Sequence, residues 1–409
     1  MEAAGRTLSV VLAGGMGSRL HPLTEGRAKP SVPFGGIYRI IDFTLSNCLH
    51  SGLRKILVLT QYKSHSLNKH LRDGWSIFNP EIGEFIVAIP AQMQMGGEWY
   101  TGTADAVYQN RGLLERSNAE YVLVLAGDHI YRMDYAEMLR KHVDRKLNVS
   151  VACMTVPINE AHAFGVIEVD NKDRIQKFVE KAKDPPTIPG DPEHALASMG
   201  IYIFNLPFLL EVLAQDHNDS ASAHDFGRNI LPGLVRTHGM SAFHFGDIEG
   251  RVGQDRYWRD VGTLDAYYQA NMDLLRPIPP INLYQKDWPI RTYHGQNPSA
   301  RMVPSSSGEV GRVENASLAG GDVIIGARVV QSILSNNVLV ESSAHVEESI
   351  LFEGVHVGVG AHLRRCIIDK DVTIPPGTKI GLKHKEDRKL FTLSKGGIVI
   401  VPKRYQFDA

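Results

Sequence analysis

The C-terminal part of the chain repeats with a period of 17 residues, and this repeat constrains the fold more than any other feature. Four series of aliphatic residues recur at that spacing in one register: Val323, Val340, Val357 and Ile374; Val329, Val346, Leu363 and Ile380; Ile333, Ile350 and Ile367; and Val338, Val355 and Val372. Within each unit the aliphatic steps are about six residues, with one step shorter, which predicts a three-sided left-handed parallel β-helix. Each coil then stacks its aliphatic side chains on those of the next coil and buries a column. Glycines fit its tight corners, namely Gly326, Gly354, Gly358, Gly360 and Gly377. An irregular β-sandwich is the alternative.

The first 275 or so residues have a different pattern, in which short apolar runs alternate with helix-like segments. We predict buried strands over residues 8–13, 56–60, 121–126 and 149–156, and helices over 40–49, 104–114 and 136–143. This alternation predicts an α/β domain with a Rossmann-like, mostly parallel sheet and helices on both faces. Ligands of such sheets bind beyond the carboxyl ends of the strands. The residues that follow Ala13 and Ala126 are therefore the places to search for a site.

Proline separates the two patterns. The sequence Arg-Pro-Ile-Pro-Pro at 276–280 cannot continue a helix, and residues 297–308 are rich in Pro, Ser and Gly. We therefore predict an α/β domain over residues 1–275, a linker over 276–308 with local structure around Trp288, and the β-helix over 309–409.

Composition excludes some classes of protein. Of 409 residues, 44 are Lys or Arg and 45 are Asp or Glu, so the net charge of −1 argues against a protein that coats nucleic acid. The three cysteines, Cys48, Cys153 and Cys366, are far apart and lack metal-ligand spacing, which fits a reducing compartment. The N-terminus has no apolar signal core, and the chain has no apolar run of about 18 residues, the length that spans a membrane. We expect a cytoplasmic protein.

A glycine-rich segment, Gly14-Gly15-Met16-Gly17-Ser18-Arg19, follows the first predicted strand. Glycines let backbone N–H groups approach an anion closely. The segment is neither a P-loop nor a Rossmann fingerprint, which would need Gly or Ala where Leu20 stands. Arg19, with its planar fork, and Lys29, with its point charge, together suit a polyphosphate. The alternative is a tight turn with two solvated basic residues.

Two aspartates are candidate metal ligands. Asp128 directly follows the predicted strand at 121–126, and Asp260 precedes a predicted helix at 264–275. Together they could hold Mg²⁺ on the phosphates of a nucleotide, because Mg²⁺ takes one or two carboxylates plus substrate oxygens. The alternatives are a turn-forming role for Asp128 and a helix-terminal or ion-pair role for Asp260. No zinc-like spacing includes His129, which we interpret as structural.

Covalent catalysis is disfavoured, because the chain has no Gly-x-Ser-x-Gly elbow and no cysteine that stands out as a nucleophile. Lys181 ends a predicted strand in the sequence Phe-Val-Glu-Lys. From its position alone, Lys181 could equally be an ordinary surface lysine with no role in a site.

The motifs taken together resemble one family. They lie at residues 12–20, 27–30, 102–107, 126–131, 178–181, 198–202, 224–227, 257–263 and 288–293. They resemble the bacterial glucose-1-phosphate adenylyltransferases, also called ADP-glucose pyrophosphorylases, within the sugar nucleotidyltransferase family. The first motif fits many sugar nucleotidyltransferases. Two others narrow the resemblance to the ADP-glucose group, namely Tyr-Trp-Arg-Asp-Val-Gly-Thr at 257–263 and His-Asp-Phe-Gly at 224–227. It runs from about residue 8 to the end of the chain.

The resemblance implies a nucleotidyltransferase domain that makes ADP-glucose and pyrophosphate from ATP and α-D-glucose 1-phosphate, feeding glycogen synthesis. It implies an in-line attack of the sugar phosphate on the α-phosphate, regulation by small metabolites and a homotetramer. The charge balance and the lack of a long apolar run argue against nucleic-acid and membrane partners. It assigns ATP binding to Gly14, Gly15, Gly17, Arg19, Lys29 and Tyr100; sugar-phosphate binding to Gly165, Glu180, Lys181, Ser198, Asp225 and Trp258; and Mg²⁺ to Asp128 and Asp260. Arg19, Lys29 and Asp128 are the implied catalytic residues, and Gln61 and Trp99 belong to the implied allosteric coupling region.

The chain departs from the family pattern at three positions. Ala182 stands where proline is usual, so the loop after Lys181 is expected to be looser. Met16 stands where some members have arginine, and Gly26 stands where the members activated by fructose 1,6-bisphosphate have an activator-binding lysine. The identity of the activator therefore stays open.

Three other functions compete with this one. The chain could be another sugar nucleotidyltransferase, or one that also accepts glucosamine 1-phosphate. It could be an inactive regulatory subunit, but Arg19, Lys29 and Asp128 are all present, which argues against that. It could be an acyltransferase that uses a β-helix histidine (His345, His356 or His362), although about four coils without a long inserted loop offer little room for a pocket.

Overall fold

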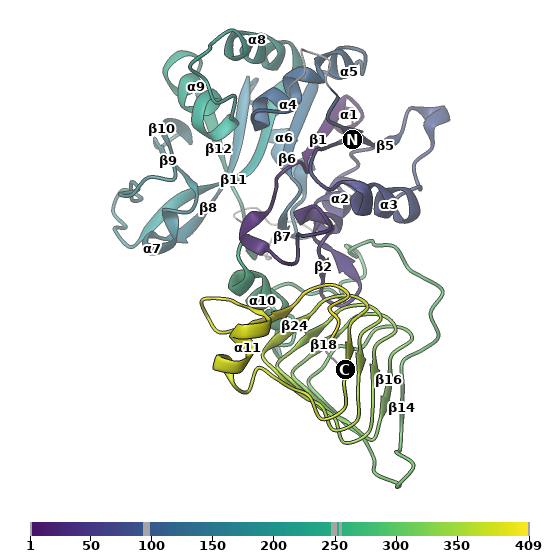
Figure 1. Ribbon diagram of the computed structural model, residues 1–409. Helices are drawn as coiled ribbons and strands as arrows, with labels where there is room; N and C mark the ends of the chain where they lie inside the picture. Colours follow the sequence, from purple (N-terminus) through teal and green to yellow (C-terminus); the bar gives the residue numbers. More distant parts are fainter. Residues whose placement is uncertain (1, 93–98, 247–251, 253–255, 408–409) are drawn as a thin grey trace.

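The computed structural model describes residues 2–92, 99–246, 252 and 256–407, which form an α/β domain above a β-helix (Figure 1). Within the described residues, the main sheet of the α/β domain has nine strands. Their spatial order is β5 (Phe85–Pro90), β4 (Lys55–Thr60), β1 (Thr7–Leu12), β6 (Tyr121–Ala126), β11 (His194–Asn205), β8 (Val149–Pro157), β12 (Met240–His244), β10 (Arg174–Glu180) and β9 (Gly165–Val169). Strands β11 and β10 run opposite to the rest, so the predicted mostly parallel sheet is confirmed.

Helices cover both faces of this sheet. One face carries α4 (Thr103–Gln109), α8 (Leu206–His217) and α9 (Leu231–Thr237), and the other carries α2 (Ile40–His50), α3 (His65–Gly74) and α6 (Tyr135–Asp144). The sequence of strand β1 is almost continuously apolar because both of its faces are buried. Leu8 and Val10 pack toward the helices of the first face, whereas Val11 packs toward those of the second. The strand is buried on both sides, as expected for a central parallel strand.

The predicted helix over 104–114 is broken in the structure, where α4 ends at Gln109 and α5 covers Arg111–Glu115. Asn110 lies at the break, and its side chain donates to the carbonyl of Ala106 and to the hydroxyl of Tyr100. The side chain thus bonds a backbone group of the last turn of α4, and the chain changes direction there.

Shorter elements complete the domain. They are α1 (Glu2–Gly5), η1 (Ser18–Leu20), η2 (Lys29–Ser31), β2 (Pro33–Phe34), β3 (Tyr38–Arg39), η3 (Pro80–Ile82), β7 (His129–Tyr131), α7 (Ile158–Ala161), the π-helical turn η4 (Phe226–Ile230), β13 (Trp258–Asp260) and α10 (Leu264–Asp273). Strands β7 and β13 pair as an antiparallel ribbon just beyond the carboxyl end of β6. No helix within the described residues is long and apolar enough to cross a membrane.

The C-terminal domain is a left-handed parallel β-helix, which excludes the β-sandwich alternative. Its described residues form three five-stranded sheets. The first contains β14 (Arg301–Val303), β16 (Val323–Ile325), β19 (Leu339–Val340), β22 (His356–Val357) and β25 (Thr373–Ile374); the second, β15 (Arg312–Glu314), β17 (Arg328–Val330), β20 (His345–Glu347), β23 (His362–Arg364) and β26 (Lys379–Ile380); the third, β18 (Ile333–Leu334), β21 (Ile350–Leu351), β24 (Cys366–Ile368), β28 (Val399–Val401) and β27 (Thr392–Leu393). Helix α11 (His384–Leu390) interrupts the last coil.

The 17-residue register is confirmed with one correction. Val329, Val346 and Leu363 stack in register and are fully buried. The residue above Val340 is Ile324, not Val323 as predicted, because the coil between Ile324 and Val340 is one residue shorter than the next coils. Val323 is only partly buried. Of the five corner glycines, four have a left-handed backbone, and Gly358 does not.

The series Ile333, Ile350 and Ile367 has a different role from the other three. Ile350 and Ile367 do not line the interior of the β-helix, which is filled at those levels by Leu334, Leu351 and Ile368. They face outward and join a hydrophobic cluster with residues of the α/β domain that includes Leu20, Phe34 and Ile40. The third sheet of the β-helix is therefore buried on both faces, and its outer face is the interdomain contact.

The segment between the domains is ordered where predicted and shorter than predicted. Trp288 is fully buried, and its indole N–H donates to the side chain of Asn47 on α2 at 3.2 Å, which confirms local structure there. Strand β14 (Arg301–Val303) lies within the predicted linker 276–308, yet it pairs with β16 and already belongs to the β-helix.

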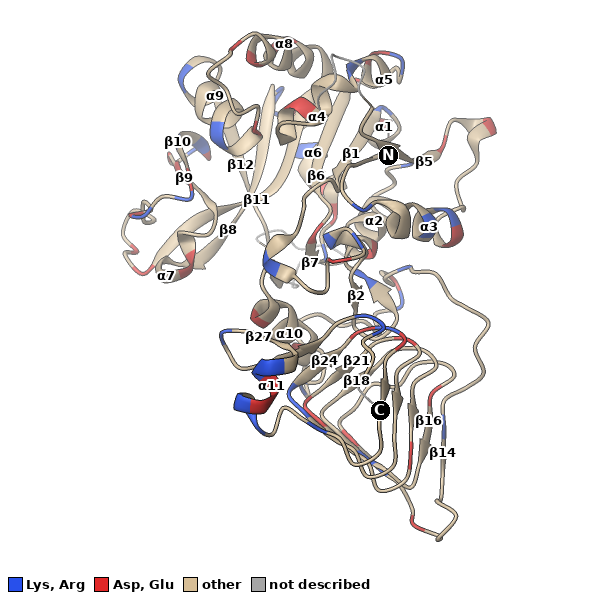
Figure 2. Cartoon of the chain, in the orientation of Figure 1, with Lys and Arg blue, Asp and Glu red and all other residues tan. Residues whose placement is uncertain are grey.

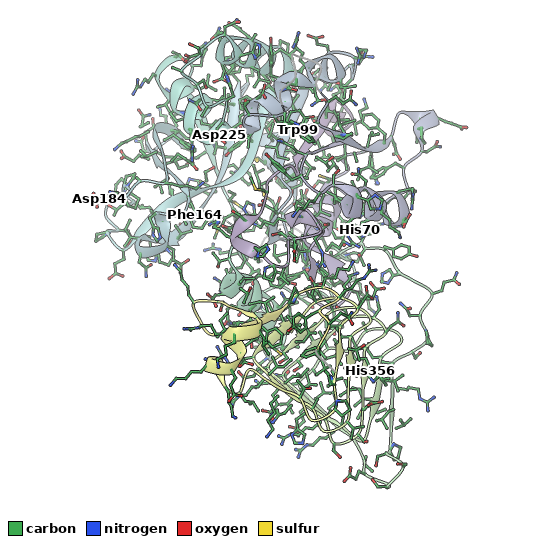
Figure 3. The ribbon with its side chains drawn as sticks, viewed as in Figure 1. His70, Trp99, Phe164, Asp184, Asp225 and His356 are labelled. Atoms are coloured by element: carbon green, nitrogen blue, oxygen red, sulfur yellow. The ribbon has the colours of Figure 1, made fainter. Side chains whose placement is uncertain are left out.

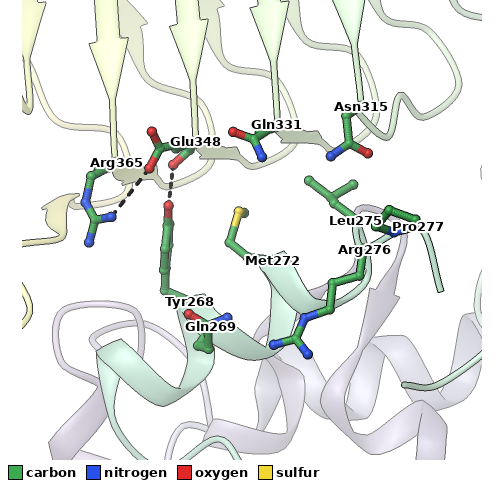
Figure 4. A pocket seen from close by; sticks show the side chains of 10 residues that line it. All are labelled: Tyr268, Gln269, Met272, Leu275, Arg276, Pro277, Asn315, Gln331, Glu348 and Arg365. Carbon is green, nitrogen blue, oxygen red and sulfur yellow. Dashed lines mark hydrogen bonds and ion pairs between the residues drawn. The ribbon is translucent and has the colours of Figure 1, made fainter. Parts of the chain in front are cut away.

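Helix α10 crosses one corner of the β-helix and leaves a cavity of about 310 Å³ (Figure 4). The hydroxyl of Tyr268 donates to the carbonyl of Glu348 at 2.7 Å, and Met272 points into the space between helix and coils. Acidic and basic residues are interspersed over both domains (Figure 2), consistent with the near-zero net charge.

Candidate active site

A lysine bridges two aspartates at the carboxyl end of the central strands. Asp128 follows β6, and Asp260 ends β13, where it pairs with His129 of β7. The ribbon β7–β13 thereby places the two carboxylates side by side. Lys29 Nζ donates to Asp128 Oδ2 at 2.9 Å and to Asp260 Oδ1 at 3.0 Å. The structure therefore brings together three of the predicted site residues.

Charge controls the protonation of this cluster. Burial lowers the pKa of Lys29, but Asp128 and then Asp260 outweigh it, so its pKa lies above the ordinary value. Burial would raise the pKa of Asp128, but Lys29, then His129, hold that pKa well below its usual range. Burial lowers the pKa of His129 despite Asp128 beside it. At neutral pH the cluster holds a charged lysine, a carboxylate and a neutral imidazole.

The glycine-rich segment packs directly on Lys29. Gly17 has a φ of 62°, and a Cβ added there would lie 3.0 Å from Lys29 Cβ, so only glycine fits without strain. Arg19 has 66% of its side chain exposed, and its Nη2 lies 3.9 Å from Asp260 Oδ2. Gly15 is exposed with open space around it. The segment thus presents backbone N–H groups and an exposed guanidinium beside Lys29.

Gln61 connects the glycine-rich segment with Tyr100. A Cβ on Gly14 would lie 3.2 Å from Gln61 Cβ, and Gln61 Nε2 donates to the carbonyl of Tyr100 at 3.4 Å. The ring of Trp99 stacks on Tyr62 with centroids 6.4 Å apart and remains half exposed. The structure thus brings Gln61 against the predicted nucleotide loop and Tyr100 against Gln61, with Trp99 stacked on Tyr62.

A second group of predicted residues gathers around Glu180. Gly165 pairs with Glu180 across β9 and β10, and a Cβ on Gly165 would lie 2.7 Å from Glu180 Oε2. Asp225 is the N-cap of η4, and its side chain accepts from the N–H groups of Gly227 and Arg228 at 3.0 Å. Its other oxygen accepts from the hydroxyl of Thr103. Gly165, Glu180 and Asp225 therefore share one wall.

Lys181 and Ser198 lie at the edges of this wall. Lys181 Nζ lies 3.1 Å from Glu180 Oε1, with 56% of the lysine side chain exposed. Ser198 is buried in β11, at the start of an irregularity in its pairing with β8 that includes Gly200. A Cβ on Gly200 would lie 3.9 Å from the His129 ring, so the irregularity extends toward the aspartates.

Trp258 links the two groups through its ring. The ring centroid lies 4.6 Å from that of His129, next to Asp128, and 5.3 Å from that of Phe164, next to Gly165. Trp258 Nε1 and His129 Nδ1 are both buried, and neither has a hydrogen-bond partner among the described residues. Buried polar groups normally have a partner. Both atoms lie where the two groups of residues meet, and Figure 3 shows Phe164 and Asp225 on the same domain.

The aspartate pair fits a magnesium ion by its chemistry. Asp128 Oδ2 and Asp260 Oδ1 both reach the same lysine nitrogen within 3.0 Å, so the two oxygens can also converge on one cation. Hard oxygen ligands of this kind are those that Mg²⁺ prefers.

Two contributors to the site were missed from the sequence. Thr103 donates to Asp225 and accepts from the N–H of Phe226, and a Cβ on Gly227 would lie 2.7 Å from Glu180 Oε2. Both lie within the motifs at 102–107 and 224–227. The motifs were the available signal, but only the structure shows that they contact each other.

Comparison with known proteins gives two family matches. The nucleotidyl transferase family matches residues 8–276, and the GlmU-like C-terminal hexapeptide family matches residues 298–401. The chain is 59% identical to glucose-1-phosphate adenylyltransferase 2 of Vibrio cholerae serotype O1, over 98% of this chain and 99% of that protein. It is 62% identical to the protein of the same name from Vibrio vulnificus strain CMCP6, with the same coverage. It is 48% identical to glucose-1-phosphate adenylyltransferase of Methylococcus capsulatus, over 97% of this chain and 93% of that protein.

Proposed function

The chain belongs to the nucleotidyl transferase family, and within it to the glucose-1-phosphate adenylyltransferases, and from this premise we propose which residues carry the reaction. The enzyme transfers the adenylyl group of ATP to α-D-glucose 1-phosphate and releases pyrophosphate. The observation that carries the proposed site is the bridge from Lys29 to Asp128 and Asp260, beside the glycine-rich segment.

We assign the ATP phosphates to the glycine-rich segment, Arg19 and Lys29. An ammonium group has three N–H donors, and Asp128 and Asp260 accept from Lys29 Nζ, so one donor remains for a phosphate oxygen. Arg19 is mostly exposed, and its planar fork can bind two phosphate oxygens at once. Gly14, Gly15 and Gly17 let the backbone approach, and Tyr100 borders the nucleotide side through Gln61.

We assign glucose 1-phosphate to the wall formed by Gly165, Glu180 and Asp225. The carboxylates of Glu180 and Asp225 can accept from sugar hydroxyls, and the exposed Lys181 can pair with the phosphate. Ser198 and the ring of Trp258, which packs on His129, border this wall toward the aspartates. The absence of a side chain at Gly165 and Gly227 leaves room beside Glu180.

The reaction needs positioning and charge stabilisation rather than a protein nucleophile. The sugar phosphate is a monoester with a second pKa near 6, so it is largely ionised at neutral pH and needs no strong base. Its oxygen attacks the α-phosphorus in line, the α–β bridging bond breaks, and pyrophosphate leaves. Lys29 and Arg19 stabilise the negative charge on the transferring and leaving groups. Asp128 and Asp260 would hold Mg²⁺, which offsets the same charge when bound.

Turnover decides this assignment against its closest alternative. Pyrophosphate release is measured with ATP, UTP and dTTP, each combined with glucose 1-phosphate or glucosamine 1-phosphate. Turnover with ATP and glucose 1-phosphate far above the other pairs supports the proposal, and a preference for another pair would identify a different sugar nucleotidyltransferase. No turnover with any pair would support the inactive regulatory subunit.

The proposal extends to regulation, assembly and location. We propose that small metabolites regulate turnover, that the chain forms a homotetramer in the cytoplasm, and that its product supplies glycogen synthesis. The contact of Gln61 with both Gly14 and Tyr100 supports regulation, because a shift of the segment near Trp99 would reach the nucleotide loop. Turnover with a set of glycolytic intermediates and AMP tests regulation, and light scattering tests the tetramer.

A further inference from the structure

Two histidines and a glutamate meet on the outer surface of the β-helix, away from the active site. His345 of β20 and His362 of β23 are in register on adjacent coils, with ring centroids 5.3 Å apart. Glu347 stands two positions after His345 on the same strand, so its side chain points to the same face. Ligand atoms of the three residues all lie within 4.8 Å of one another, the one such trio of His, Cys, Asp or Glu in the described part of the chain.

These side chains are available to a ligand. His362 Nε2 is buried and has no hydrogen-bond partner among the described residues. A buried nitrogen without a partner is uncommon in folded proteins and calls for an occupant.

Neighbouring charges set limits on that occupant. Arg328 and Lys379 continue the same column on the coils above and below the histidines, and both disfavour a cation. Arg364 is in register with Glu347, but its guanidinium lies 3.6 Å from Glu348 instead. Arg364 therefore pairs with Glu348, and the Glu347 carboxylate lies with the two histidines.

We propose that His345, Glu347 and His362 bind a divalent transition-metal ion of the zinc class, which clips two coils of the β-helix together. Two imidazoles and one carboxylate form a donor set that zinc takes, with a fourth position open to water. Mg²⁺ and Ca²⁺ prefer oxygen ligands and fit this set poorly. Ligand atoms bound to zinc lie about 2.0–2.1 Å from the ion and therefore roughly 3.4 Å from one another. The three ligand atoms here lie within 4.8 Å of one another, so each side chain would move toward the ion by about 1 Å.

Zinc titration into the full-length, chelator-treated protein tests the proposal. We expect one more bound zinc in the wild type than in His362→Gln, together with a rise in Tm that is lost in His362→Gln and in Glu347→Gln. Cobalt in place of zinc should give the visible absorption of a four-coordinate site in the wild type but not in His362→Gln or Glu347→Gln. His356→Gln is the matched control, because His356 is an outward histidine of another sheet, 3.3 Å from Glu341, and the control should behave as the wild type.

Turnover separates this site from the catalytic centre. Zinc can also contact Asp128 and Asp260. The wild type and the three variants all keep these aspartates, so this binding adds equally to the zinc stoichiometry of each and cancels in the comparison. His362→Gln should keep wild-type turnover with Mg²⁺, since the residue lies on the β-helix outside the proposed active site. Equal zinc stoichiometry and equal Tm shifts in the wild type and His362→Gln would overturn the proposal.

Discussion

Arg27 donates from Nη2 to both carboxylate oxygens of Asp369, at 2.7 and 2.9 Å, across the boundary between the α/β domain and the β-helix. The two side chains are 6% and 1% exposed. Arg27 stands two residues before Lys29, in the segment that carries the catalytic cation. The β-helix therefore holds the loop of the active site through a buried ion pair.

Replacing Asp369 by Asn should destabilise the enzyme and raise the KM for ATP. Removing one partner of a buried pair leaves the other charge uncompensated and costs about 3–5 kcal/mol. The Lys29 loop then loses its anchor, so the effect should fall on ATP more than on glucose 1-phosphate. Tm and steady-state kinetics measure both changes. Glu120→Gln is the control, because it breaks the exposed pair Arg6–Glu120 and should leave Tm and KM as they are.

Replacing Lys29 by Gln should lower kcat/KM by about a hundredfold or more, the scale of losing one charge-stabilising donor. The neutral side chain leaves Asp128 and Asp260 facing each other without the cation that bridges them. Steady-state kinetics with both substrates measure the loss. Lys63→Gln is a matched control, because Lys63 is an exposed lysine near the same segment, and it should retain most activity. A small loss in Lys29→Gln would remove Lys29 from the catalytic set.

Asp128→Asn should abolish turnover far more than it weakens glucose 1-phosphate binding. The amide cannot supply the charge that a magnesium ligand needs. Binding of the sugar phosphate by calorimetry and turnover over a range of Mg²⁺ concentrations separate the two effects. Near-normal turnover in this variant would contradict the metal assignment.

Lys181→Gln should chiefly raise the KM for glucose 1-phosphate and leave the KM for ATP nearly unchanged. The lysine lies beside Glu180 at the edge of the proposed sugar wall and is exposed enough to meet a phosphate. Lys177→Gln is the control on β10, the strand that ends just before Lys181, because Lys177 pairs with Glu168 on the surface. Equal KM values in the two variants would argue that Lys181 is only a surface residue.

Asp322 should make stability depend on pH. Its buried carboxylate accepts from the N–H groups of Ala319 and Val338, and burial raises its pKa to about 7. A raised carboxyl pKa means that the folded state binds the proton more tightly than the unfolded chain does. The protonated Asp322 therefore contributes its full stabilisation of the fold below about pH 4, and this stabilisation is lost as the pH rises through about 7. The Tm of the wild type should therefore fall relative to that of Asp322→Asn over that range, and a constant difference in Tm would contradict the raised pKa.

Several features were predictable because they depend on neighbours in the chain. The 17-residue period could be read from the sequence because each coil stacks on the next in register. Aliphatic residues such as Val329, Val346 and Leu363 therefore follow one another at that spacing. The error at Val323 arose because Val323 and Ile324 are both aliphatic, and one shorter coil shifts the inward position by one. Gly17 and Asp128 could be predicted as site residues because each follows a buried strand.

Other features depend on distance through space. Thr103 contacts Asp225 across 122 residues, so no spacing in the sequence could pair them. Ile350 and Ile367 fit the repeat, but the repeat does not say that they face the other domain, because a buried strand can be covered on either side.

Residue order alone decides the two architectures and the segments that supply the active site, because helix, strand and coil periodicity are local properties of the backbone. Only the folded chain decides that Lys29 lies between Asp128 and Asp260, and that Arg27 reaches Asp369, 342 residues away. The physical reason is that the energy of an ion pair depends on the distance between charges and on their burial, not on their separation along the chain.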